Sequence, residues 1–126
     1  MQRLRIAVAT AAIGAVALGA APVIAASSSA DQAKATVTIN VTAKDFSFKL
    51  SKQSVKAGTT VVFKLTNKGQ VIHDFQIVPL KKKTPYAQPG KTSKVTIKFT
   101  KKGSYKYICT VPRHAQEGME GTFKVT

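Results

Sequence analysis

Residues 36–50 read TVTINVTAKDFSFKL, and apolar and polar side chains alternate along them. The apolar side chains recur at every second position in two series: Val37, Ile39 and Val41, then Phe46, Phe48 and Leu50. A period of two places successive side chains on opposite faces of a β-strand, and Val, Ile, Thr and Phe all favour strands. The stretch therefore predicts two half-buried strands.

The same alternation returns along the rest of the chain. It is clear at 61–65 and 95–99, and further extended segments are expected at 71–78, 104–109 and 122–126. Turn signals separate these segments: Gly58, Asn67-Lys68-Gly69, Pro89-Gly90 and Lys102-Gly103. No stretch shows sustained helical periodicity. The pattern predicts an all-β, antiparallel two-sheet sandwich of seven or eight strands.

Residues 79–89 are the least regular part of this pattern. They include Lys81-Lys82-Lys83 and Tyr86, and we expect a loop or an irregular edge segment there. The three lysines are interpreted as a solvated surface in preference to a docking patch.

The N-terminus has the composition of an export signal. Arg3 and Arg5 precede an apolar run, and small residues around Ala25 resemble a cleavage site. We expect a cleaved secretory signal peptide at 1–25, a flexible lead-in at 26–34 and a single domain at 35–126. An uncleaved N-terminal anchor is the alternative, although Gly14, Gly19 and Pro22 interrupt the run.

The chain is strongly basic. Its formal net charge is +15, which falls to about +13 without Arg3 and Arg5. Such a charge favours acidic protein faces and anionic membrane surfaces. Nucleic acid is not expected as a partner, because no recognition helix or RNA-binding aromatic signature is visible. Most of the lysines are interpreted as keeping the outward faces of a small sandwich soluble.

Side chains that bind soft metals are few, and they fall into one pattern. The chain has one cysteine, two histidines and one methionine beyond Met1. Three of these form Cys109-x4-His114-x4-Met119, and His73 lies in a strand-like segment upstream. Singly, each has an ordinary structural explanation, such as a buried thiol or a core methionine. Together, two imidazoles, a thiolate and a thioether form the ligand set of a copper site for electron transfer.

The chain resembles the cupredoxin family of small blue-copper proteins. The resemblance rests on the strand pattern, on His73 with an aromatic residue two positions later, and on the run from Tyr107 to Met119. It implies a Greek-key sandwich that binds one type 1 copper ion. Metal ligands would be His73 and His114 through Nδ1, Cys109 through a short equatorial bond, and Met119 as a weak axial ligand. His114 would be the more exposed ligand and the electron gate.

The resemblance also implies a function. We expect a monomeric single-electron carrier, exported to the periplasm or cell surface, without catalytic activity. Its partners would be redox proteins with an acidic docking face, of the cytochrome or membrane oxidoreductase class, and it could also contact an anionic membrane peripherally. The alternative is a periplasmic copper-binding carrier without a redox shuttle role. A metal-free structural sandwich is a further rival, and stability that does not depend on copper would favour it.

The numbers of histidines and cysteines argue against a catalytic copper protein. Multicopper oxidases and nitrite reductases need further histidines, and dinuclear copper sites need a second cysteine. Nucleophilic catalysis by Cys109 and His114 would leave His73 and Met119 without a role.

Two residues depart from the family pattern. Asp74 follows His73 where the family often has Asn, and a carboxylate accepts hydrogen bonds but does not donate them. Different hydrogen bonds around the site are therefore expected. Arg113 precedes His114 where many relatives have Gly. We expect its positive charge to favour Cu(I) and an acidic partner, unless the side chain points away into solvent.

Overall fold

The computed structural model describes residues 14, 19 and 35–126. The predicted signal peptide at 1–25 and lead-in at 26–34 therefore lie outside the described residues, apart from Gly14 and Gly19. Within the described part of the chain, no helix is long and apolar enough to cross a membrane.

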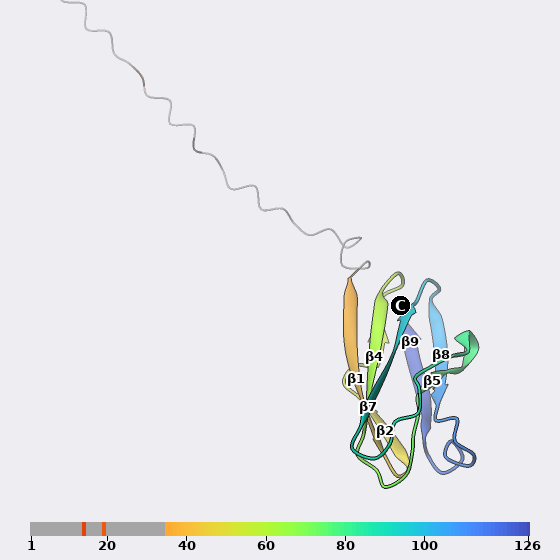
Figure 1. Cartoon of the computed structure of the whole chain (residues 1–126). Helices are drawn as coiled ribbons and strands as arrows, with labels where there is room; N and C mark the ends of the chain where they lie inside the picture. The colour runs from red at the N-terminus through yellow and green to blue at the C-terminus, as the bar shows by residue number, and fades with distance from the viewer. Residues whose placement is uncertain (1–13, 15–18, 20–34) are drawn as a thin grey trace, which may run out of the picture.

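Two β-sheets pack face to face (Figure 1). The four-stranded sheet has the order β2-β1-β4-β7, with β1 (Thr36–Lys44), β2 (Ser47–Leu50), β4 (Thr60–Asn67) and β7 (Thr92–Lys98). The five-stranded sheet has the order β3-β9-β8-β5-β6, with β3 (Ser54–Val55), β9 (Glu120–Val125), β8 (Gly103–Ile108), β5 (Gln76–Ile77) and β6 (Lys82–Lys83). A short 3-10 helix, η1 (Val78–Leu80), joins β5 to β6.

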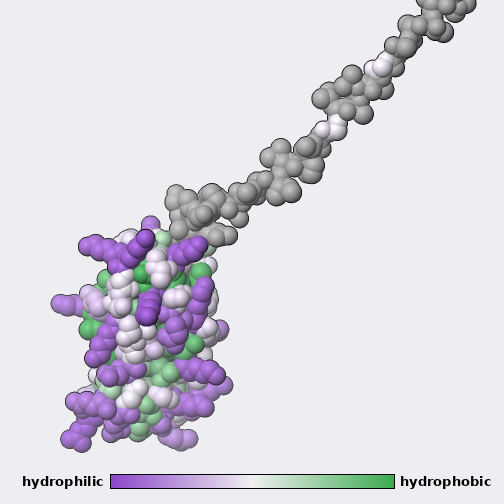
Figure 2. All heavy atoms as spheres, turned by 180° about the vertical axis from the view of Figure 1, so that it is seen from behind, coloured by the Kyte–Doolittle hydropathy of each residue, from purple (hydrophilic) through white to green (hydrophobic). Residues whose placement is uncertain are grey.

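The core lies between the sheets, where the alternating apolar side chains meet. Phe63 of β4 packs against Phe75 and Phe123, with ring centroids 4.9 and 5.4 Å apart, and all three rings are fully buried. Ile39 and Val41 of β1 are buried beside them. Hydrophilic side chains project from the molecule's outline (Figure 2). The predicted two-sheet, all-β sandwich is confirmed.

The pairing within the sheets is mixed, so the prediction of a purely antiparallel sandwich is wrong in this respect. β1 pairs with β4 in parallel, Ile39 lying opposite Phe63, and β3 pairs with β9 in parallel. The physical reason is a crossover: after β2 the chain passes through β3 in the other sheet before it returns as β4. The described residues form nine strands, and three of these are only two residues long.

The segment at 71–78 also differs from the prediction. Only Gln76 and Ile77 are strand, and His73 makes an isolated bridge with Ala87. The irregular edge expected at 79–89 is confirmed, since β6 lies at the outer edge of the five-stranded sheet.

Candidate metal centre

The connections between β4 and β5 and between β8 and β9, which carry the chemistry-bearing residues, lie at one end of the sandwich, the lower end in Figure 1, away from the C-terminus. His73 lies in the connection between β4 and β5. Cys109 follows β8 directly, and His114 and Met119 lie in the connection that leads into β9. All four side chains are buried; His114 is the most accessible, at 8%.

Three donor atoms form a small triangle. The Nδ1 atoms of His73 and His114 are 3.2 Å apart, and the Sγ atom of Cys109 lies 3.5 Å from Nδ1 of His114 and 3.9 Å from Nδ1 of His73. A point equidistant from these atoms would be about 2.1 Å from each, within the roughly 2.0–2.3 Å bonds of divalent zinc to imidazole and thiolate. The side chains are thus already spaced to hold one first-row metal ion.

The backbone around His73 is fixed by two neighbouring residues. His73 and Ala87 exchange two backbone hydrogen bonds, of 3.2 and 2.8 Å. Asn67, fully buried at the end of β4, donates its side-chain amide to the carbonyls of Val71 and Ala87, and its Oδ1 accepts from the backbone N–H of Gly69. These bonds hold the His73 connection rigidly, although it is not part of a continuous strand.

Asp45, in the turn between β1 and β2, orients the His73 ring. Its Oδ1 lies 2.6 Å from Nε2 of His73, which places the proton on Nε2 and leaves the Nδ1 lone pair directed at the triangle. The backbone N–H of Gln70 also donates to Asp45, at 2.7 Å. That bond, aided by His73, lowers the pKa of Asp45, so the carboxylate stays ionised.

Tight turns position the other ligand candidates. The backbone N–H of Cys109 donates to the carbonyl of Met119, and the N–H of Met119 donates to the carbonyl of His114, both at 3.0 Å. The N–H of His114 donates in turn to Val111, at 3.1 Å. This connection therefore folds back on itself, so that residues ten positions apart meet.

Asp74 secures the residue after the cysteine. It is fully buried and accepts hydrogen bonds from the backbone N–H of Thr110, at 2.6 Å, and from the Thr110 hydroxyl. Lys83 of β6 lies 3.8 Å from the same carboxylate. Asp74 thus only accepts hydrogen bonds, and a lysine from the sheet edge helps to balance its charge.

Burial controls the protonation of the donor atoms. It raises the pKa of the Cys109 thiol, so the free thiol keeps its proton until a metal displaces it. Burial, together with the charge of His73, lowers the pKa of His114, which keeps that imidazole neutral and able to bind a metal. Phe46 packs edge-on against His114, with ring centroids 4.9 Å apart.

This donor set suits copper. Two imidazole nitrogens and one thiolate in a buried trigonal arrangement, with a methionine beside them, are typical of blue-copper sites. A family model described as a cupredoxin-like domain matches residues 15–123. The chain belongs to the cupredoxin-like family. It is a copper-binding cupredoxin with the donor set of a type 1 site.

Two curated proteins are similar to this chain in sequence. "Copper-resistant cuproprotein CopI" of Rubrivivax gelatinosus is 28% identical, over 72% of this chain and 67% of the relative. The protein of the same name from Pseudomonas aeruginosa is 26% identical, over 76% of this chain and 80% of the relative.

Solved structures share the fold. Auracyanin A, a "blue" copper protein of Chloroflexus aurantiacus, superposes with a TM-score of 0.61 at 23% identity, covering 72% of this chain and 99% of that one. Auracyanin B gives a TM-score of 0.61 at 24% identity, covering 73% and 88%. These likenesses show a common sandwich.

The structure brings together the predicted residues His73, Cys109 and His114. Met119 is buried and joined to both Cys109 and His114 through its backbone. Arg113 is exposed, and its expected influence on the copper stays a prediction.

The sequence analysis missed several residues around the site. From the sequence pattern, Asp45, Asn67 and Gly69 are only strand or turn positions. The alternation predicts Phe46 on the apolar face of a strand, but it lies before β2 and is 36% exposed. The scarcity of acidic residues was the one available signal for Asp45, which is among only five Asp and Glu in the chain.

Proposed function

We propose that this cupredoxin is a single-electron carrier whose four copper ligands are His73, Cys109, His114 and Met119. When bound, the copper ion supplies the one-electron couple between Cu(II) and Cu(I). His73 and His114 would bind through Nδ1, Cys109 as the thiolate and Met119 through its thioether. The soft sulfurs suit Cu(I) and the imidazoles suit both oxidation states.

The observation that carries the proposal is the prior arrangement of the donors. Their spacing already matches a metal site, and each is held by bonds that do not involve the metal: Asp45 to His73, Met119 to Cys109, and Val111 to His114. A site that moves little between oxidation states transfers electrons with a low barrier. His114 is the one donor of the triangle that reaches the surface appreciably, which suits it as the electron gate.

Electronic absorption tests the site itself. Cu(II) added to the protein should give an intense one-to-one thiolate charge-transfer band that disappears on reduction. Cys109→Ser should lack the band, and Ser104→Ala, an exposed change in β8, should keep it. A wild-type protein without the band would refute the copper ligation proposed here.

Copper storage or delivery without a redox role is the second candidate function. The names of both relatives, copper-resistant cuproproteins, favour it. Two measurements separate the candidates: the electron self-exchange rate of the loaded protein, and the rate at which it loses copper to a Cu(I) chelator. Fast self-exchange with slow loss supports the electron carrier, and the reverse supports the copper carrier.

The remaining expectations belong to the same proposal. We infer an exported, monomeric protein of the periplasm or cell surface, with acidic redox proteins as partners and no catalytic activity. The chain's two histidines in total support the last point, because copper enzymes of this fold class need more. Kinetics with an acidic cytochrome should slow as ionic strength rises.

A further inference from the structure

Many exposed lysine side chains lie on the outer face of the four-stranded sheet. Alternate residues of β2, β1, β4 and β7 point away from the core, and six of the outward residues on or directly after these strands are lysines. We call this set the lysine face: Lys44, Lys49, Lys64, Lys68, Lys94 and Lys98. Thr, Ser and Asn fill most of the other outward positions, and Val62 is the aliphatic exception.

The strand register concentrates this charge. Lys64 lies directly opposite Lys94 in the pairing of β4 with β7. Like charges facing each other across a sheet are destabilising unless something neutralises them. Among the described residues, none of the ion pairs involves the lysine face; those of lysine are Lys83 with Asp74 and Lys106 with Glu120. No acidic side chain of the described residues therefore forms an ion pair with the lysine face.

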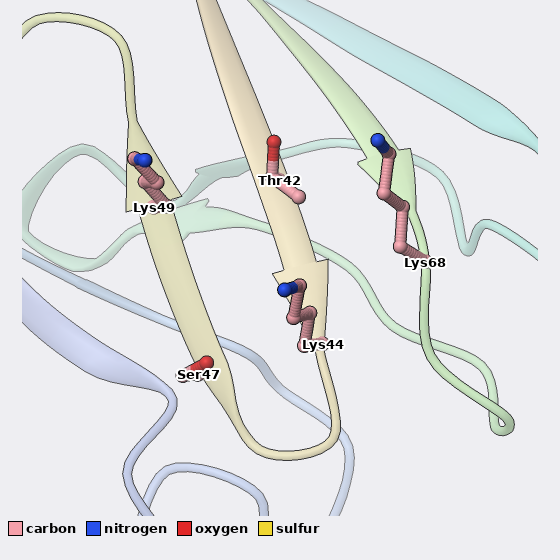
Figure 3. Close-up of a pocket in the computed structure, with 5 residues that line it drawn as sticks. All are labelled: Thr42, Lys44, Ser47, Lys49 and Lys68. Carbon is pink, nitrogen blue, oxygen red and sulfur yellow. The ribbon is translucent and has the colours of Figure 1, made fainter.

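A hollow of about 380 Å3 lies at one end of the face. Its lining residues come from β1, from β2 and from the position directly after β4, and they stand on the same side of the sheet (Figure 3): Thr42, Lys44, Ser47, Lys49 and Lys68. Ammonium and hydroxyl groups are the donors that bind phosphate oxygens. The hollow is therefore suited to an anionic headgroup.

We propose that the lysine face binds the surface of an anionic lipid bilayer. Protein interfaces are enriched in aromatic residues and Arg and depleted in Lys, and this face has the opposite composition. A hydrated point charge such as Lys needs no shape-matched acceptor, and a membrane's surface potential attracts each lysine near it. A broad sheet surface fits such a partner.

The lysine face does not include the copper ligands, although its hollow, next to Asp45 and Gly69 in the sequence, lies at the same end of the strands. The ligands lie in connections at one end of the strands, whereas the lysine face runs along the strands. A protein lying on a membrane through this face would keep His114 available to a redox partner. The proposal itself does not depend on copper, so it can fail or succeed separately from the electron-carrier function.

The other sheet offers a matched control. Its outward residues include Lys106, which pairs with Glu120 at 3.5 Å, and Lys124. Lys64→Gln with Lys94→Gln removes two charges from the lysine face. Lys106→Gln with Lys124→Gln removes the same net charge from the opposite sheet. All four side chains are exposed, so both double variants should fold.

The test is co-sedimentation of the whole chain with vesicles. Phosphatidylcholine mixed with phosphatidylglycerol is compared with phosphatidylcholine alone, at low and high salt. We expect binding to the mixed vesicles only, weakened by salt, and reduced about thirtyfold by the lysine-face variant, or about fivefold per lysine. The control variant should lose much less. Circular dichroism and the copper charge-transfer band check that both variants are folded.

Several outcomes would overturn the proposal. Equal losses in the two double variants would mean that net charge alone attracts the protein. Equal binding to both kinds of vesicle would point to an apolar N-terminal anchor. Binding of the lysine face to an acidic protein but not to phosphatidylglycerol would assign the face to a protein partner.

Discussion

Oδ1 of Asp45 lies 2.6 Å from Nε2 of His73. A turn within the four-stranded sheet therefore orients a ligand that lies in the connection from that sheet to the five-stranded sheet. The bond fixes the tautomer in which Nδ1 of His73 faces Cys109 and His114. A charged acceptor also increases the basicity of the imidazole, which strengthens its bond to a metal ion.

Replacing this carboxylate should weaken the site. Asp45→Asn keeps the shape but removes the charge, so we expect copper affinity to fall about 10- to 100-fold. The reduction potential should rise, since Cu(II) loses more stabilisation than Cu(I). Competition with a chelator and redox titration measure the two effects. Lys56→Gln, an exposed charge change beside the C-terminal residues and far from the ligands, is the control and should change neither.

Gly69 permits the approach of Asp45 to His73. A Cβ atom at this position would lie 2.8 Å from Nε2 of His73 and closer still to Oδ1 of Asp45. Gly69→Ala should therefore push the two groups apart and reproduce the loss of copper affinity that we expect for Asp45→Asn. Ser104→Ala, an exposed change in β8, serves as a control for affinity. Wild-type affinity in Gly69→Ala would contradict the proposed role.

Phe46 shields His114 from solvent. Phe46→Ala should admit water beside the imidazole, favour the more highly charged Cu(II), and so lower the reduction potential. Leu80→Ala on η1 removes a side chain of similar exposure, 37% against 36%, far along the chain from the ligands. An unchanged potential in Phe46→Ala would show that its ring does not control solvent access.

Thr110 stabilises the buried charge of Asp74. Thr110→Val removes the hydroxyl donor while the backbone donor remains, and we expect the free energy of unfolding to fall by about 1.5–3 kcal/mol. Thr122→Val, on the exposed face of β9, should cost little. Denaturant unfolding of both variants measures the difference, and equal stabilities would contradict the importance of this bond.

Acid should destabilise the metal-free protein through His114. Its pKa is lowered in the fold, so between the folded pKa and the unfolded value of about 6.5 the unfolded chain binds more protons. Stability is then complete above pH 6.5 or so and declines as pH falls below it. Denaturant unfolding between pH 7.5 and 5 should show this slope, and His114→Gln should flatten it. The pKa of Asp45 is lowered from 3.8, so its own effect comes at lower pH.

Local patterns predicted most of the fold, because a period of two is visible wherever one face of a strand is buried. The parallel pairing of β1 with β4 could not be predicted, because the sequence of each strand does not indicate which distant strand it pairs with or in which direction. Segment 71–78 resembles a strand because it is rich in Val, Ile and Phe, yet only Gln76 and Ile77 form a strand, and His73 makes a single isolated bridge with Ala87.

The metal ligands could be predicted from the sequence because their residue types are rare in this chain. One cysteine, two histidines and one further methionine allowed few combinations. The supporting residues were not predictable in this way, because Asp45 and Asn67 are of ordinary types and act through contacts with residues 20 to 28 positions away. Asp74 was noticed only as a departure from the family pattern, and its partner Thr110 became clear from the geometry.

The hydrogen bonding of the donor triangle sets an order of assembly. The imidazoles and the thiol lie close enough to satisfy one another, and no buried side-chain nitrogen or oxygen among the described residues lacks a partner. His73 is 36 residues from Cys109 and 41 from His114, so the triangle exists only after distant strands have paired. Folding should therefore come first and copper acquisition second. Copper would then bind to a site whose ligands the fold has already brought together.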